Sequence, residues 1–174
     1  MKISLNNQKG FTLIELVVVL VILALLAAVA VPKFFDLQKQ AEAASVQGVL
    51  GSVRSALSIR MAKGLVEGED IAELAFDGTS PLDPMGDLLS NKPETYQGAI
   101  ANSNEKGVWF DDSDNNDLVY VLQNDDIVSD SQDQGGVQKL RFHIVAITDT
   151  IDGETVTVGL ELQPKDPASF DWLF

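Results

Sequence analysis

The sequence predicts an α+β fold in which one long N-terminal helix packs on an antiparallel sheet of about four strands. The first observation is the apolar stretch of residues 11–31, followed by apolar residues at the helical spacings of three and four as far as Met61. The second is a C-terminal half containing short runs rich in Val, Ile, Phe and Tyr, which favour strands. The third is that turns rich in Asp, Asn and Gly separate those runs. Strands that follow a helix, rather than alternate with helices, are typical of the α+β class.

The N-terminal stretch has the features of a membrane segment. Residues 1–10 form a short polar leader with two lysines, Lys2 and Lys9, and residues 11–31 are almost entirely apolar. At about 1.5 Å per residue, this helix just spans a bilayer core of about 30 Å. The lysines favour a cytoplasmic leader, which places the rest of the chain outside the inner membrane. Glu15 is the only charged residue of the stretch, and because a charge at mid-membrane costs about 3 kcal/mol, it requires a specific role.

The second half of the helix is predicted over residues 32–64. Pro32 has no N–H to donate, so we expect a kink or local melting of the helix there. Beyond it, the apolar residues form a stripe that must pack on another element, while charged residues such as Glu42 occupy the other positions. Gly64, shortly after two basic residues, is expected to end the helix.

Residues 65–174 are expected to form a globular domain. Its predicted strands share a high content of β-branched and aromatic residues and cover 108–110, 118–122, 140–147 and 155–162. Asp152-Gly153 is a hairpin signal between the last two strands. One face of this sheet would bury the apolar stripe of the helix. We also expect a short helix at 70–76, and the aromatic tail 170–174 should dock on the sheet or on a neighbouring subunit.

Composition excludes several classes of function. The net charge is −14, so the surface as a whole is not expected to bind nucleic acid, whose phosphates require Lys and Arg. The sequence contains no cysteine and one histidine, His143. Thiol nucleophiles, Cys-based zinc sites and His-based catalytic sets therefore lack their residues, and we expect no enzymatic activity.

An acidic turn is the one candidate metal site, and calcium is the one candidate cofactor. Asp112, Asp114 and Asn116 place oxygen ligands at alternate positions, as at the start of an EF-hand loop. Asp117, a fourth candidate ligand, stands where that loop needs glycine, and Gln123 stands where it needs a bidentate glutamate. The alternative is a solvated hairpin turn, because Asp and Asn tolerate turn conformations.

The stretch from Lys9 to Leu16, with the sequence KGFTLIEL, resembles the N-terminus of type IV prepilins and pseudopilins. This resemblance extends to about Phe34 and implies that a prepilin peptidase cuts between Gly10 and Phe11. It also implies that the new amine of Phe11 is methylated. Glu15 would then neutralise the N-terminus of a neighbouring subunit in a filament.

The resemblance implies a pilin-like fold with three parts. Residues 1–10 would be the leader peptide, residues 11–64 the long helix with 11–31 in the membrane or the filament core, and residues 65–174 the globular domain. The implied function is a structural subunit of a type IV pilus or of a secretion-type pseudopilus, at the inner membrane and then at the cell surface or in the periplasm. The implied partners are other pilin subunits, the prepilin peptidase and the inner-membrane assembly platform.

Short segments in the middle of the chain give a second resemblance, to pilin-like subunits of the mannose-sensitive haemagglutinin (MSHA) type. These segments are residues 84–85, 93–98, 108–111 and 118–120. The chain departs from many type IV pilins in having no C-terminal cysteine pair. A disulfide-bounded loop is therefore not expected.

Two other interpretations explain part of the N-terminus. A secretory signal peptide would use Ala28-Val29-Ala30 as its cleavage site, but residues 11–31 exceed the usual apolar length of 7–15 residues and contain Glu15. A membrane-anchored extracytoplasmic binding module that never polymerises would explain the apolar helix. It would have no use for the leader junction at Gly10 or for the acid in the helix.

Overall fold

The computed structural model describes residues 10–69, 85–86, 88–124 and 137–165. The predicted helix at 70–76 and the aromatic tail 170–174 lie outside these residues. The chain divides into two compact units, residues 1–40 and 41–174, and each is described by itself.

The helix α1 runs from Leu13 to Glu67. It passes through Pro32 without a break, so the expected local melting is absent. It also continues past Gly64, which is buried and serves packing instead of ending the helix. The end comes at Gly68, whose φ of 73° is in the left-handed region that glycine tolerates. The N–H of Glu69 donates to the carbonyl of Gly64 at 2.9 Å, the closing bond of a Schellman motif.

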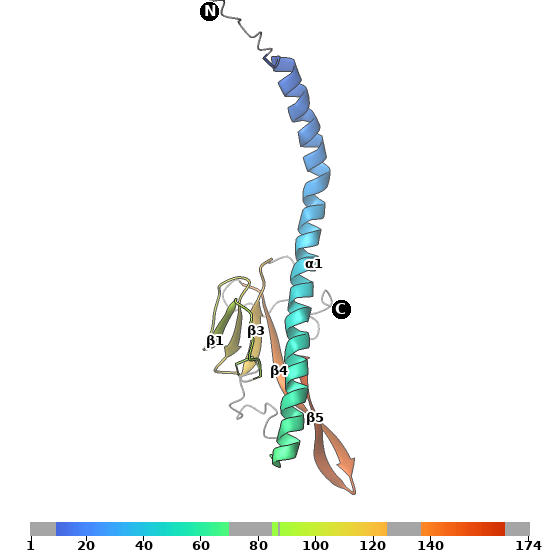
Figure 1. Ribbon diagram of the computed structural model, residues 1–174, viewed down its shortest axis with the longest axis vertical. Helices are drawn as coiled ribbons and strands as arrows, with labels where there is room; N and C mark the ends of the chain where they lie inside the picture. Colours follow the sequence, from blue (N-terminus) through green and yellow to red (C-terminus); the bar gives the residue numbers. More distant parts are fainter. Residues whose placement is uncertain (1–9, 70–84, 87, 125–136, 166–174) are drawn as a thin grey trace, which may run out of the picture. The chain divides into compact units, whose positions relative to one another are not determined.

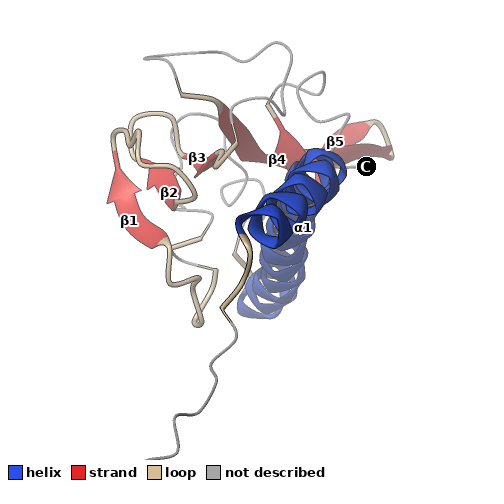
Figure 2. Ribbon diagram, turned by 90° about the horizontal axis from the view of Figure 1, so that it is seen from above, coloured by secondary structure: helices blue, strands red, loops and turns tan. Residues whose placement is uncertain are grey.

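Five strands form one sheet in the chain order β1-β2-β3-β4-β5 (Figure 2). The strands are β1 (Tyr96–Ile100), β2 (Trp109–Asp112), β3 (Asp117–Val121), β4 (Lys139–Ile151) and β5 (Glu154–Pro164). All neighbouring pairs are antiparallel except β1 and β2, which are parallel. The structure confirms the α+β class and differs in the number of strands. The additional strand is β1, whose short sequence contains Gly98 at a φ of 90° and therefore lacks a strong strand pattern.

The main core lies between α1 and one face of the sheet. The helix contributes four fully buried residues at helical spacing, Val46, Leu50, Val53 and Leu57. From the strands, the core takes Trp109, Leu118, Tyr120, Leu140, Phe142, Ile144 and Leu162. Trp109 and Tyr120 pair directly across β2 and β3, with ring centroids 4.8 Å apart. The predicted apolar stripe of the helix thus has the sheet as its partner.

The sheet is also buried on the face away from α1. Val108, Phe110, Val119 and Val121 form a second apolar cluster there, with Ile100 and Val137 packed against it. Burial on both faces explains why β2 and β3 have no exposed residue and no alternation of apolar and polar residues.

The outer parts of β4 and β5 form a two-stranded ribbon that extends beyond the other strands (Figure 1). Residues 148–151 of β4 pair with residues 154–157 of β5. Asp152-Gly153 makes the turn, with both residues at positive φ, which the sequence signal predicts.

Candidate assembly site at the start of the helix

Thr12 and Glu15 form a capping box at the start of α1. Thr12 immediately precedes the first helical residue, and its backbone N–H and its hydroxyl each donate to Oε2 of Glu15 at 2.8 Å. In return, the Glu15 N–H donates to Thr12 Oγ1 at 3.3 Å. This reciprocal arrangement satisfies N–H groups that have no partner within the helix. The sequence analysis missed this role, although Thr-x-x-Glu before an apolar run is a recognisable capping signal.

The segment before the helix is accessible. Phe11 is 93% exposed, and the space around Gly10 is open, with no heavy atom within 4 Å of an added Cβ. The predicted scissile bond between these two residues is therefore not shielded by any described part of the chain. Glu15 is also exposed, so its carboxylate is accessible to a neighbouring chain.

The apolar half of α1 has no partner within the chain. The described part of the structure contains one helix long and apolar enough to cross a membrane, and the most apolar part of this helix is not buried in the protein. Seventeen large apolar side chains from Leu13 to Leu37 are more than two-fifths exposed. An apolar surface of this size needs lipid or other protein chains to cover it. A kink of this segment at Pro32 remains a prediction.

The acidic turn predicted as a calcium site connects β2 and β3. Asp112 ends β2, Asp117 begins β3, and the two residues are register partners. Oδ1 of Asp112 accepts the backbone N–H groups of Asp114 at 3.0 Å and Asn115 at 3.2 Å. Asn116 completes the turn with a φ of 51°. These local bonds are the ones by which Asp and Asn stabilise a turn.

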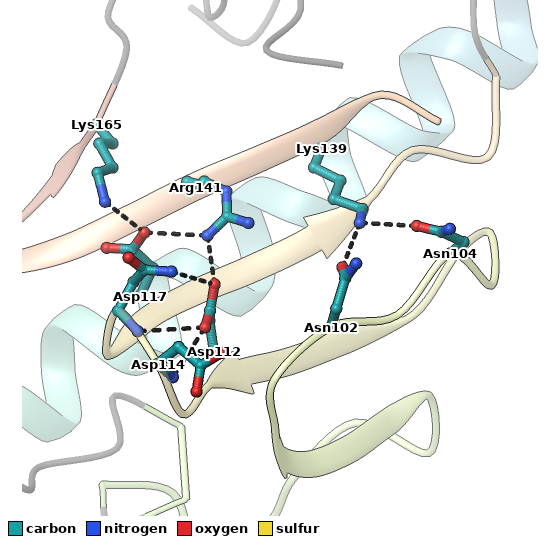
Figure 3. A network of polar contacts seen from close by, with 9 residues as sticks. Asn102, Asn104, Asp112, Asp114, Asp117, Lys139, Arg141 and Lys165 are labelled. Atoms are coloured by element: carbon teal, nitrogen blue, oxygen red, sulfur yellow. Dashed lines mark hydrogen bonds and ion pairs between the residues drawn. The ribbon is translucent and has the colours of Figure 1, made fainter. Parts of the chain in front are cut away.

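Two basic side chains, Arg141 and Lys165, balance the negative charges of Asp112 and Asp117 at this turn (Figure 3). Nη1 of Arg141, from β4, lies 2.6 Å from Oδ2 of Asp112 and 3.2 Å from Oδ2 of Asp117. Nζ of Lys165, just after β5, lies 2.8 Å from Oδ2 of Asp117. The cluster therefore ties the turn to β4 and to the residue that follows the last strand.

The ion pairs with Arg141 and Lys165 engage the carboxylates predicted to bind calcium, and a calcium site at this turn remains a prediction. Asp112 and Asp117 are 1% exposed or less and are already paired with cations, whereas Asp114 is exposed. Oδ1 of Asp117 is buried without a hydrogen-bond partner and could accept a further ligand. It is a single oxygen, however, and calcium takes six to eight oxygen ligands. No group of three or more acidic or histidine side chains in the described ranges is arranged to hold a metal ion. The turn is a salt-bridged structural element in this structure.

The charge cluster changes the acidity of Asp112. Burial raises the pKa of its carboxyl, but hydrogen bonds from Arg141, Asn115 and the Asp114 N–H, together with the Arg141 charge, outweigh that effect. The pKa of Asp112 is therefore below the ordinary value for an aspartate.

Glu42 is a second structural residue that the sequence analysis misplaced. It was expected on the polar side of the helix, yet it is only 8% exposed. Its Oε1 accepts the Tyr120 hydroxyl at 3.1 Å and the Gln123 N–H at 2.6 Å, and its Oε2 accepts Asn124 Nδ2 at 2.7 Å. Burial, together with the neighbouring Glu42 carboxylate, raises the pKa of Tyr120. These bonds fix α1 on the end of β3.

Comparisons with known proteins agree with the geometry of the N-terminus. Residues 5–31 match the family model described as the prokaryotic N-terminal methylation motif. The chain is 52% identical over 61 residues to the type IV narrow pilus major component PilA5 of Thermus thermophilus, covering 34% of this chain and 53% of that protein. It is 31% identical over 109 residues to a fimbrial protein of Moraxella nonliquefaciens, covering 62% of this chain and 68% of that protein. A fimbrial protein of Dichelobacter nodosus is 45% identical over 94 residues, or 54% of this chain and 51% of its own length. No solved structure matches the chain.

A long helix that begins at a methylation motif and packs its second half on a mostly antiparallel sheet is the architecture of a pilin. The chain belongs to the type IV pilin family. Type IV pilins are structural subunits of pili, which agrees with the expectation that the chain is not an enzyme. Its match spans about half the length of the Thermus relative. The finer resemblance to MSHA-type subunits remains a prediction.

Proposed function

We propose that the chain is made as an inner-membrane prepilin, cut between Gly10 and Phe11, methylated on the Phe11 amine and assembled into a filament through α1. The match of residues 5–31 to the N-terminal methylation motif is the observation that carries this proposal, since it spans the scissile bond. The exposure of Phe11 and the open space at Gly10 support access for a peptidase.

Before assembly, α1 has to be held in the membrane. The exposed apolar side chains between Leu13 and Val31 suit lipid, and Lys2 and Lys9 favour a leader on the cytoplasmic side. Glu15 lies in the first turn, where it is bonded to Thr12 near the membrane surface. The acid therefore has a partner in a single subunit and does not block insertion.

In the filament, Glu15 would lose some of its hydrogen bonds to Thr12 and contact a neighbouring subunit instead. The amine of Phe11 on an adjacent subunit stays cationic after methylation and would pair with the carboxylate. In a low-dielectric core the attraction is strong but desolvation is also large, so the pair would set the axial register of subunits more than their net stability. The partners are other pilin subunits, the prepilin peptidase and the inner-membrane assembly platform. The filament would be either a surface pilus, with roles such as cell adhesion, or a secretion pseudopilus.

The test is the mass of the N-terminus in sheared filaments and in the membrane pool. We expect a methylated Phe11 as the first residue in filaments, and an uncut protein that remains in the membrane when Gly10→Glu fills the position before the bond. A first residue of Val31 would instead establish a secretory signal peptide. An uncut wild-type chain that forms no filaments would establish the non-polymerising anchor.

A further inference from the structure

The 41–174 unit leaves two groups of large apolar side chains uncovered. Among the described residues after Leu37, these exposed side chains lie either at the end of α1 or on the outer parts of β4 and β5. They are Ile59, Leu65 and Val66 on the helix, and Ile147, Ile151 and Val158 on the strands. Their exposed fractions range from 44% to 88%. Since both groups are exposed in the same subunit, they do not cover each other within it.

The first surface, which we name the helix-end patch, consists of Ile59, Lys63 and Val66. Spacings of four and three place these residues on one stripe of α1. Ile59 is 71% exposed and Val66 is 88% exposed. The Lys63 side chain is 64% exposed, and Nζ lies 3.7 Å from a Glu67 carboxylate oxygen, a surface ion pair of little strength. The patch is therefore apolar with one weakly held positive charge.

The second surface, which we name the outer ribbon, consists of residues 147–158. Ile147, Asp149 and Ile151 alternate along β4 and so share one face of the ribbon. Glu154 is the register partner of Ile151 and therefore lies on the same face. The ribbon contains three carboxylates in all and no Lys or Arg. It is thus apolar and negatively charged.

The distribution of charge decides what the outer ribbon can contact on a second copy. Residues 68–174 contain 22 acidic and five basic residues, so the sheet domains of two copies repel each other. In α1 there are five basic and four acidic residues. The three charged residues between positions 43 and 66, Arg54, Arg60 and Lys63, are all basic, and the next acidic residue along the helix is Glu67, the partner of Lys63. The exposed part of α1 is therefore less acidic than the sheet domain. An acidic ribbon can approach this part of a second copy without strong repulsion.

We propose that the outer ribbon of one subunit docks on the helix-end patch of the next, with Ile151 against Ile59 and Glu154 opposite Lys63. The two surfaces differ, so the contact is head-to-tail and leaves one free surface at each end of every pair. Such a contact continues from subunit to subunit, as a filament requires. The proposal rests on the proposed function, because it describes how assembled subunits meet outside the apolar half of α1.

A disulfide cross-link tests this contact directly, because the natural chain has no cysteine. Filaments of the Ile59→Cys, Ile151→Cys double variant are oxidised with copper phenanthroline and run on a non-reducing denaturing gel. We expect a ladder of covalent multimers, and monomers from filaments of either single variant. The matched control is Ile59→Cys with Ala99→Cys, since Ala99 is exposed on β1 at the other edge of the sheet and should give no ladder.

Charge reversal gives a second measurement that does not depend on cross-linking. Lys63→Glu is expected to reduce the filament yield several-fold, and Glu154→Lys in the same chain is expected to restore it. Arg54→Glu is the matched control, because Arg54 is exposed nine residues earlier, about half a turn around the helix from Lys63, and should have little effect. Normal filaments from the double cysteine variant without a ladder, or no recovery in the double charge variant, would overturn the contact while leaving the filament function intact. Absence of filaments from the wild-type chain would overturn the proposed function itself and the contact with it.

Discussion

At the scale of the residue, Glu15 has two possible partners. In the single subunit it accepts two hydrogen bonds from Thr12, whereas in the proposed filament it pairs with the Phe11 amine of a neighbour. We expect Glu15→Val to leave membrane insertion and cleavage intact and to reduce the yield of sheared filaments relative to the membrane pool. Thr12→Ala separates the two roles, because it removes the hydroxyl that binds Glu15 but keeps the carboxylate and its bond from the backbone N–H, so the filament yield should stay normal. Normal filaments from Glu15→Val would contradict the pairing role.

Glu42 joins the helix to the sheet and to the residues that follow β3 through three hydrogen bonds. Replacing it with Ala leaves the buried Tyr120 hydroxyl and the Gln123 N–H without an acceptor, so we expect a loss of about 2–3 kcal/mol in the free energy of unfolding. Glu42→Gln keeps an acceptor oxygen and should recover most of that loss. The control is Glu67→Ala, since Glu67 is an exposed acid of the same helix and its removal should change stability by less than about 0.5 kcal/mol. Denaturant midpoints of the full chain in detergent provide the comparison.

At the scale of the element, the β2–β3 turn makes stability depend on pH. The pKa of Asp112 is lower in the folded chain than its ordinary value of 3.8, so between these two values the unfolded chain binds more protons than the folded one. The contribution of Asp112 is therefore fully present above about pH 5 and is lost as the pH falls through the folded pKa. We expect Asp112→Asn to lower the unfolding midpoint at pH 7 and the difference from wild type to shrink below about pH 4. Asp114→Asn, at an exposed position of the same turn, is the matched control and should change the unfolding midpoint at pH 7 by much less.

The sequence predicted those elements whose pattern is local. The buried side of α1, from Val46 to Leu57, follows from apolar spacing alone, and the β4–β5 turn follows from Asp152-Gly153. β1 was missed because its five residues, which include Gly98, have no strong strand pattern, and the strand is defined by its pairing with β2.

The roles of the carboxylates were harder to predict, because their partners are distant in the sequence. Glu42 bonds to groups 78 to 82 residues away, and Asp112 bonds to Arg141, 29 residues away. In a chain with 26 acidic residues, no local signal identifies the few that are buried. The capping role of Glu15 differs, since its partner Thr12 is only three residues away and the motif was present in the sequence.

At the scale of the whole molecule, one side of α1 packs on the sheet, which leaves the opposite side free for the proposed assembly. Gly48 and Gly51 lie on the outward side of α1, and a Cβ added at either position would have no atom within 4 Å apart from its chain neighbours and the nearby backbone of the helix. Glycine inside a helix destabilises it by about 0.5–1 kcal/mol relative to alanine, and nothing within the subunit requires it here. Substitutions on this side can therefore accumulate without harming the fold of the single chain. Sequence change on this side would be limited only by the contacts between subunits in the proposed filament. Two diverging strains could therefore keep identical subunit structures and yet lose the ability to build mixed filaments.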